Sequence, residues 1–321
     1  MTRSPSTCRP GDQRAVGLLL GVLADGVLGD PRRWHPVAGY GNLAAAAERR
    51  WWADSRRRGA AYTGGLVLVP VLMGAVAERL APCGWRRVAV TAAATWSVLG
   101  ARSLGHEAMT MAALLGDADL ARARERLSHL AGRDAARLGA GELARASMES
   151  VAENTSDAVV APLLWGALAG VPGLLGYRAI NTLDAMVGHR ATRYLRFGWA
   201  AARLDDVANL VPARLTALLA AALAPVVGGR TLAALRVWRR DAAQHPSPNA
   251  GPVEAAFAGA LGVRLGGTNS YGGQPEERGV LDGGRLPGVR DLPRAVRLAV
   301  AVDLVAALVA AVLARTTGRR R

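Results

Sequence analysis

The stretch from Ser147 to Asp157, SMESVAENTSD, carries three acidic residues at helical spacing. In a helix, Glu149, Glu153 and Asp157 occupy positions i, i+4 and i+8 and therefore share one face. Carboxylates aligned in this way repel each other unless a cation or an arginine lies between them. Because Mg²⁺ prefers oxygen ligands and often binds together with substrate phosphates, the spacing predicts a magnesium–nucleotide site with these three side chains as ligands.

A structural alternative for the same stretch is helix capping. The acidic residues directly precede a charge-free apolar run, so Asn154, Ser156 or Asp157 could cap the helix that follows. Capping accounts for one residue but not for Glu149 and Glu153 together, and acidic groups at a membrane boundary are candidates for function. We therefore expect Glu153 and Asp157 to be catalytic and Asn154 to contribute to nucleotide binding.

A second motif, RAINTLDAMVGHR, places an acid three residues after an asparagine. Asn181 as helix cap with Asp184 at the third helical position is nearly a capping box, which is the structural alternative. His189 could act as a base and Arg190 could hold a phosphate group, although a single histidine is often a hydrogen-bonded packing residue. Both interpretations stay open, with Asp184 and His189 as catalytic candidates and Arg190 as a phosphate ligand.

A third cluster, ARLDDVANLVPARL, contains the adjacent acids Asp205 and Asp206. Neighbouring residues cannot share one helix face, so we expect one of the two to pair with Arg203. Arg214 lies in an otherwise apolar stretch and needs an anionic partner, either a substrate phosphate or one of the two aspartates. We predict catalytic roles for the aspartates and phosphate binding by the two arginines.

Two polar segments rich in turn-forming residues complete the candidates. GDPRRWHPV covers residues 29–37, and QHPSPNAGPVEAAFAGALGVRLGG covers residues 244–267. A loop rich in glycine and asparagine can present backbone N–H groups to phosphate oxygens, so Ser247, Asn249 and Asn269 are candidate cofactor-binding residues. Turn formation alone also accounts for most of these residues.

Composition excludes several classes of protein. All 40 basic residues are arginine, so a lysine Schiff base with pyridoxal phosphate and a phosphate-binding loop lysine are ruled out. Two cysteines cannot build a disulfide framework. The formal net charge is +15, but the arginines are spread over every polar segment without interleaved aromatic residues, so we expect no nucleic-acid partner.

Apolar runs between these motifs approach the roughly 20 residues that cross a bilayer. They predict an all-α, polytopic integral membrane protein of a single domain, residues 1–321, with about five or six spans and a long polar loop at 241–293. An aspartate within the first run argues against a signal peptide, and prolines and glycines could make the fourth run re-entrant. The candidate spans are residues 15–29, 59–77, 88–101, 158–177, 207–229 and 298–314.

Loop charge suggests an orientation in the cell membrane. The loops 31–58, 102–145 and 230–294 are rich in arginine, and placing them in the cytoplasm satisfies the positive-inside tendency. The active site would then face the cytoplasm. The arginines at 319–321 fit this arrangement less well.

Taken together, these segments resemble the CobD/CbiB family of cobalamin biosynthesis. The matching stretches lie in the family's order between residues 25 and 273. Ser156 stands where the family usually has a bulkier residue, and Gly251-Pro252 lacks the common tryptophan between them. The stretches that carry the resemblance are GDPRRWHPV, ESVAENTSDAVVAPLLW, GYRAINTLDAMVGHR, ARLDDVANLVPARLTA and HPSPNAGPVEAAFAGALGVRLGG.

The resemblance implies an integral-membrane adenosylcobinamide-phosphate synthase. Such an enzyme joins a carboxylate of the corrinoid adenosylcobyric acid to (R)-1-aminopropan-2-ol phosphate, or to the free aminopropanol, and consumes ATP. Implied cofactors are ATP and Mg²⁺; implied partners are the corrinoid, the amine, membrane lipid and other cobalamin-pathway enzymes. In this interpretation the three acids of the first motif hold Mg-ATP, the aspartates of the other two orient the amine or a second metal, and the arginines bind phosphate.

Two other functions remain open from the sequence. A membrane prenyl- or phospho-alcohol transferase also uses Asp-rich helix ends and Mg²⁺, and it would form a lipid product without ATP. A corrinoid-binding membrane protein without catalytic activity would bind the corrinoid and leave it unchanged.

Overall fold

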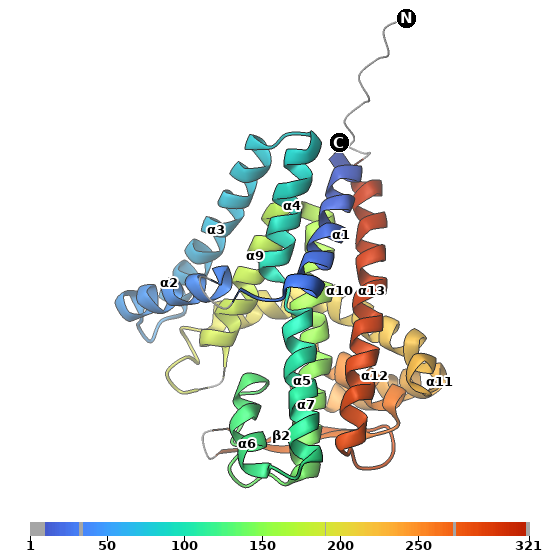
Figure 1. The fold of residues 1–321 in the computed structure, drawn as a ribbon. Helices are drawn as coiled ribbons and strands as arrows, with labels where there is room; N and C mark the ends of the chain where they lie inside the picture. Colours follow the sequence, from blue (N-terminus) through green and yellow to red (C-terminus); the bar gives the residue numbers. More distant parts are fainter. Residues whose placement is uncertain (1–9, 32–34, 190, 272–273, 319–321) are drawn as a thin grey trace, which may run out of the picture. The chain divides into compact units, whose positions relative to one another are not determined.

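The computed structural model describes residues 10–31, 35–189, 191–271 and 274–318, and this part of the chain is mostly helical (Figure 1). The chain divides into two compact units, each assembled from separate segments. Unit 1 comprises Met1–Gly100, Ala161–Ala208 and Ala306–Arg321. Unit 2 comprises Ala101–Val160 and Asn209–Val305. Two of the boundaries fall inside the long helices α10 (Trp199–Leu223) and α13 (Leu292–Thr317).

In unit 1, helices α1 (Pro10–Leu28) and α4 (Gly84–Val98) pack closely against each other. Gly17 lies against Thr91, and Gly21 lies against Thr95. A Cβ atom at either glycine would overlap the threonine side chain. Small residues four positions apart allow two helix backbones to approach, a pattern common between helices in membranes.

Unit 1 also contains α2 (Pro36–Trp51), α3 (Arg56–Leu80), α8 (Ala161–Ala169) and α9 (Val171–Leu183), together with the start of α10 and the end of α13. Helix α3 packs along α9. Their core includes Tyr62 and Phe197, whose ring centres are 4.9 Å apart. The predicted span 158–177 is not one continuous helix, because Gly170, with a φ of 72°, separates α8 from α9. A positive φ ends a helix and is adopted readily by glycine.

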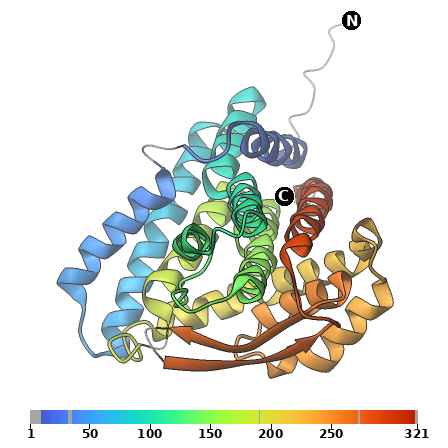
Figure 2. The same ribbon diagram turned by 60° about the horizontal axis from the view of Figure 1, so that its bottom comes forward.

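Unit 2 contains a helix pair, a second helix pair and a β-hairpin. Helix α7 (Ala140–Thr155) packs on α5 (Ala101–Gly116), and α12 (Ala250–Leu261) packs on α11 (Thr231–Asp241). The antiparallel strands β1 (Arg264–Tyr271) and β2 (Gln274–Asp282) lie beside α7 and α12 (Figure 2). The short helix α6 (Leu120–Arg126) lies between α5 and α7 in the chain.

The prediction of a polar loop over 241–293 is wrong. This region holds α12 and both strands, so the fold is helical with one hairpin and not all-α. Every residue of α12 is buried, because its many alanines and glycines allow neighbouring elements to approach from all sides. The glycines and prolines on both sides of this helix are typical of loops, which is why the sequence predicted a loop here.

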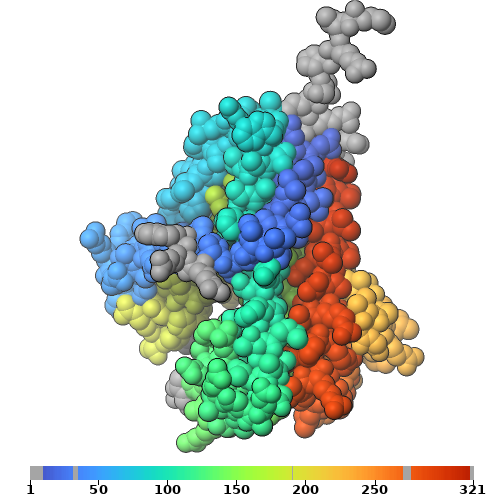
Figure 3. All heavy atoms as spheres, in the orientation of Figure 1, coloured from blue at the N-terminus to red at the C-terminus, as the bar shows by residue number. Residues whose placement is uncertain are grey.

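Within the described residues, three helices are long and apolar enough to cross a membrane: Arg56–Leu80, Trp199–Val227 and Val289–Thr317. They contain or overlap the predicted spans 59–77, 207–229 and 298–314. In α13, a stripe of apolar side chains four residues apart is exposed, as expected for a surface that faces lipid. Figure 3 shows α13, in red, at the surface of the molecule in this view. The stripe consists of Val300, Leu304, Leu308 and Val312.

Candidate functional site

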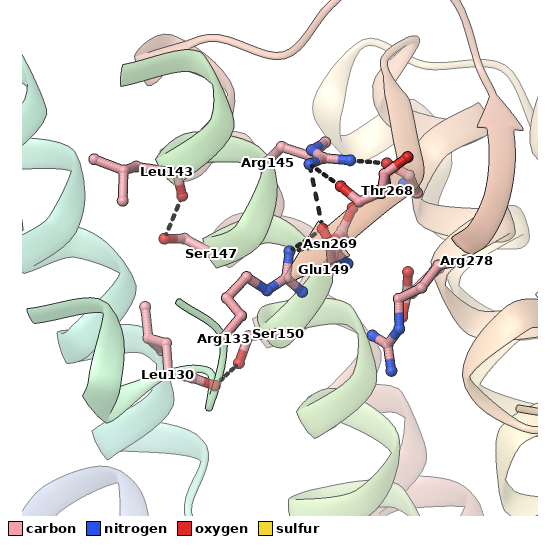
Figure 4. Close-up of polar contacts among 12 residues, drawn as sticks. Leu130, Arg133, Leu143, Arg145, Ser147, Glu149, Ser150, Thr268, Asn269 and Arg278 are labelled. Atoms are coloured by element: carbon pink, nitrogen blue, oxygen red, sulfur yellow. Dashed lines mark hydrogen bonds and ion pairs between the residues drawn. The ribbon is translucent and has the colours of Figure 1, made fainter. Parts of the chain in front are cut away.

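A buried ion pair lies at the centre of the polar cluster in unit 2. Glu149 lies on the buried face of α7, and its Oε2 is 2.7 Å from Nη1 of Arg133 (Figure 4). Oε1 of Glu149 accepts a hydrogen bond of 2.7 Å from the backbone N–H of Gly266. The side chain of Arg133 is 4% exposed, and that of Glu149 is 1% exposed. A buried charge requires such compensation, so the pair is a fixed part of the structure of unit 2.

Ser150 fixes the loop that carries Arg133. Its hydroxyl donates to the carbonyl of Leu130, three residues before the arginine. This contact holds the segment between α6 and α7 against α7, so that the guanidinium group reaches Glu149 (Figure 4).

A second arginine converges on the same cluster from α7. The Oδ1 atom of Asn269 accepts from Nη1 of Arg133 at 3.0 Å and from Nη2 of Arg145 at 3.2 Å. Arg145 also donates to the carbonyls of Gly266 and Thr268. Asn269, a predicted cofactor-binding residue, thus joins two cationic side chains to the hairpin.

A bulge in β1 makes this arrangement possible. The strand register shifts between Gly266 and Thr268, and Gly266 has a φ of 77°. This backbone conformation is accessible mainly to glycine, and here it turns the N–H of Gly266 toward Glu149 while its carbonyl faces Arg145.

A second buried acid lies on α12. Glu254 is fully buried, and neither of its carboxylate oxygens has a hydrogen-bond partner among the described residues. Oε1 of Glu254 is 3.6 Å from Nε2 of the buried His245, whose Nδ1 accepts from the N–H of Ser247 at 3.1 Å. Two ionisable side chains are therefore enclosed together without a matching set of hydrogen bonds.

Burial determines the protonation of this pair. It raises the pKa of Glu254 well above its usual value, and the nearby charges of Glu149 and Glu153 raise it further. Burial also lowers the pKa of His245 to about 4, with a further contribution from the positive charge of Arg278. Burial therefore favours the uncharged form of both side chains.

The predicted magnesium ligands are only partly available for a metal. Glu149 is already neutralised by Arg133, whereas Glu153 and Asp157 are half-buried. Asp157 lies in a π-helical turn, Ser156–Val160, which alters the helical spacing after α7. Among the described residues, no three His, Cys, Asp or Glu side chains are grouped to hold a metal ion. Glu153 and Asp157 would hold Mg²⁺ only with most ligand positions left to water and phosphate.

Other predicted residues of unit 2 make local contacts. The amide of Asn154 donates to the carbonyl and hydroxyl of Ser150. Ser247 Oγ accepts from the N–H groups of Asn249 and residue 250 at the start of α12, as turn chemistry suggests. Arg214 donates to Oδ1 of Asn249 at 2.8 Å, so a neutral amide is one partner of this arginine.

The remaining predicted residues belong to unit 1. Asp184 begins a π-helical turn, Asp184–Gly188, after α9. His189 contacts Tyr194 edge to face, with ring centres 4.9 Å apart. Arg203 pairs with Asp206 at 3.6 Å, which confirms the expected pairing of one aspartate, while Asp205 is half-buried. Arg190 lies outside the described residues.

The sequence profile of the CobD/Cbib protein family matches residues 18–299. The chain belongs to the CobD/CbiB family. It is 56% identical over 300 residues to the cobalamin biosynthesis protein CobD of Mycobacterium tuberculosis, covering 94% of this chain and 96% of the relative. It is 45% identical over 293 residues to the CobD protein of Chromobacterium violaceum, covering 88% and 91%. No solved structure matches the chain.

In this CobD/CbiB protein, the sequence analysis did not predict several residues of the candidate site in unit 2. Glu254 is the only charged residue in the stretch 250–261, and a lone acid among alanines was a usable signal. Arg133 and Arg145 carried no signal, because they are two of many arginines in this stretch and nothing in the sequence separates the buried ones from the exposed ones. His245 was visible only as one of five scattered histidines.

Proposed function

We propose that this protein acts in cobalamin biosynthesis as an ATP-dependent carbon–nitrogen ligase. It would convert adenosylcobyric acid and (R)-1-aminopropan-2-ol phosphate, or the free aminopropanol, to adenosylcobinamide phosphate or cobinamide. The observation that carries this proposal is the match to CobD proteins along almost their whole length. The arginine- and carboxylate-rich cluster of unit 2 supports it, because phosphoryl transfer requires charge neutralisation and positioning.

The chemistry requires two steps. A carboxylate oxygen of the corrinoid attacks the γ-phosphorus of ATP, ADP leaves, and an acyl phosphate forms. The amine nitrogen then attacks the acyl carbon, inorganic phosphate leaves, and a base accepts the proton lost from nitrogen. Neither step needs a lysine, and arginines can stabilise the negative charge of each phosphate.

The proposed roles belong to the residues of the acidic motifs and to the arginines and asparagines near them. We propose that Glu153 and Asp157 contact Mg²⁺, which would neutralise phosphate charge, and that Asn154 and Asn269 help bind the nucleotide. Glu149 acts by holding Arg133 in place. In unit 1, Asp184, Asp205 or Asp206 would orient the amine, with His189 as base and Arg190 and Arg203 as phosphate ligands. In unit 2, Arg214, Ser247 and Asn249 would contribute to binding.

We further propose that α1, α4 and the α8–α9 pair lie in the bilayer with the three long apolar helices. This arrangement gives about six spans in the cell membrane. The arginine-rich segments 31–58, 102–145 and 230–294 would face the cytoplasm, where ATP is available. Membrane lipid would then be a constant partner of the protein.

The proposal is tested on the full chain purified in detergent. Adenosylcobyric acid, aminopropanol phosphate and Mg-ATP are added, and the mass of the corrinoid is followed. A gain equal to the amine minus water, dependent on ATP, supports the ligase. Product without ATP refutes the acyl-phosphate route. An unchanged corrinoid with folded protein and a lipid product supports the transferase, and corrinoid binding without any product supports the binding protein.

Two variants test the residue roles. Glu153→Gln and Asp157→Asn keep the shape of each side chain and remove its charge. Each is expected to lower activity by roughly 100-fold, as when one electrostatic contact to the transition state is lost. The thermal unfolding temperature should stay close to that of the unaltered protein, because the mutated side chains are half-buried. Near-normal activity in both variants contradicts the assignment. Arg239→Gln, an exposed change on α11, is the matched control.

A further inference from the structure

A corner rich in arginine and tryptophan connects α2 to α3 in unit 1. The stretch 49–58, RRWWADSRRR, contains five arginines and two tryptophans. Helix α2 ends at Trp51, and α3 starts at Arg56 with Ser55 as its cap. The short turn between the helices brings the last turn of α2 next to the first turn of α3.

The corner contains a hollow of about 280 Å³ that is open to solvent. It is lined by Arg50, Trp51, Arg58 and Ala61, all of which are exposed. Small-molecule pockets usually have volumes of about 300–1,000 Å³, so this hollow is slightly smaller than a typical one. A phosphate group with its immediate substituents fits this hollow better than a nucleotide or a corrinoid does.

The two arginines of the hollow have no acidic partner within the described parts of the chain. The two carboxylates nearest in sequence, Glu48 and Asp54, pair with other arginines. Two exposed guanidinium groups beside one hollow attract an anion, and their planar forks match phosphate oxygens.

The hollow lies at the end of two apolar helices. Both α3 and α10 are long and apolar enough to cross a membrane, and α10 starts at Trp199. The guanidinium group of Arg56, the first residue of α3, lies 5.4 Å from the ring centre of Trp199. The starts of the two helices therefore lie close together. Arginines and tryptophans at the ends of apolar helices are typical of a membrane–water interface.

The side of α3 beyond the corner offers a surface for acyl chains. Of the most apolar 18-residue stretch of α3, only 17% is buried in the structure. The exposed apolar side chains on this helix are Leu68, Val69, Leu72, Met73, Val76 and Leu80. A ligand that places an anion in the hollow and hydrocarbon along α3 would satisfy both surfaces, and a soluble anion would satisfy only one.

We propose that the hollow formed by Arg50, Trp51 and Arg58 binds the head-group phosphate of an anionic phospholipid, whose acyl chains lie along α3. The two arginines contact the phosphate oxygens, and the indole of Trp51 packs beside the glycerol. This site does not depend on the ligase reaction, and it gives the predicted lipid partner a defined position on the protein.

The test measures lipid binding by the full chain in detergent micelles, using short-chain fluorescent phosphatidylglycerol and phosphatidylcholine. The unaltered protein is expected to prefer phosphatidylglycerol. Each arginine near an anionic lipid surface contributes a factor of about five, so Arg50→Gln/Arg58→Gln should weaken binding by roughly 25-fold. The control Arg236→Gln/Arg239→Gln removes the same charge from exposed positions on α11 and should leave binding unchanged.

Three results would overturn the proposal. Equal affinity of the unaltered protein and the hollow variant places the lipid elsewhere. Equal weakening in the hollow and control variants shows that net charge, not the hollow, attracts the lipid. Displacement of phosphatidylglycerol by millimolar inorganic phosphate or ATP identifies a site for soluble anions. If the double variant unfolds, Arg50→Lys/Arg58→Lys keeps the charge without the planar fork and should show a smaller loss of the same preference.

Discussion

The buried pair of Arg133 and Glu149 allows a quantitative test. In Arg133→Met, the carboxylate of Glu149 stays buried with the N–H of Gly266 as its only remaining partner among the contacts described above. Removing one member of a buried ion pair costs about 3–5 kcal/mol, because the other charge loses its compensation. For a compact unit of the size of unit 2, this loss should lower the unfolding temperature by roughly 6–20 °C.

The double variant Arg133→Met/Glu149→Gln supplies the comparison. It removes both charges but keeps an acceptor for the N–H of Gly266, and replacing a whole buried pair is often neutral. We expect it to unfold within a few degrees of the unaltered protein. Circular dichroism at 222 nm in detergent follows the transition. The reasoning is refuted if the single and double variants unfold at the same temperature.

The same variants separate two roles of Glu149. If this residue only holds Arg133, the double variant should have the same Mg²⁺ requirement as the unaltered protein in the corrinoid assay. A requirement for several-fold more Mg²⁺ at half-maximal activity would identify Glu149 as a metal ligand, as its helical spacing first suggested.

Three further predictions concern other parts of the fold. The raised pKa of Glu254 makes unit 2 lose stability as pH rises through that value, and the lowered pKa of His245 makes it lose stability as pH falls from 6.5 toward about 4. Glu254→Gln should therefore flatten the fall in stability as pH rises above the ordinary pKa of glutamate, and parallel profiles would show that Glu254 is not buried as an acid. Gly21→Val should lower the unfolding temperature by an amount equivalent to about 1–3 kcal/mol through overpacking of α1 on α4, and an unchanged temperature would argue against this contact. Asn249→Leu should cost about 1.5–3 kcal/mol by removing one of the two acceptors of Arg214, whereas Asn249→Asp should retain stability; equal stability of both in thermal unfolding would contradict the assigned hydrogen bond.

Periodicity and composition predicted the long apolar helices and the acidic helix, because these features depend on local sequence. The segment 241–293 failed for a physical reason. Helix α12 is apolar on all sides except for Glu254, so it lacks the polar face that marks a surface helix. The hairpin that follows contains glycines whose positive φ serves a bulge, and strand alternation is lost there.

The sequence predicted the acidic residues of the candidate site but not the residues that pack against them. Helical spacing indicated that the acids of α7 share a face, but it could not indicate what packs against that face. Arg133 reaches Glu149 through a loop, and Asn269 reaches both arginines from a strand more than 100 residues later in the chain. Contacts of this kind depend on the tertiary fold and leave no periodic pattern in the sequence.

These long-range contacts also determine when the polar cluster can form during synthesis. Arg133 and Glu149 are 16 residues apart and can pair early, but the partners on β1 lie 117 residues after Glu149 and 136 residues after Arg133. Residues of unit 1 are made in between, since the segment Ala161–Ala208 separates the two halves of unit 2. Until the ribosome reaches the hairpin, the ion pair of the nascent chain lacks the N–H of Gly266 and the amide of Asn269. A chain truncated before residue 264 would therefore leave these charges incompletely satisfied, which makes the hairpin the last element required to complete the cluster.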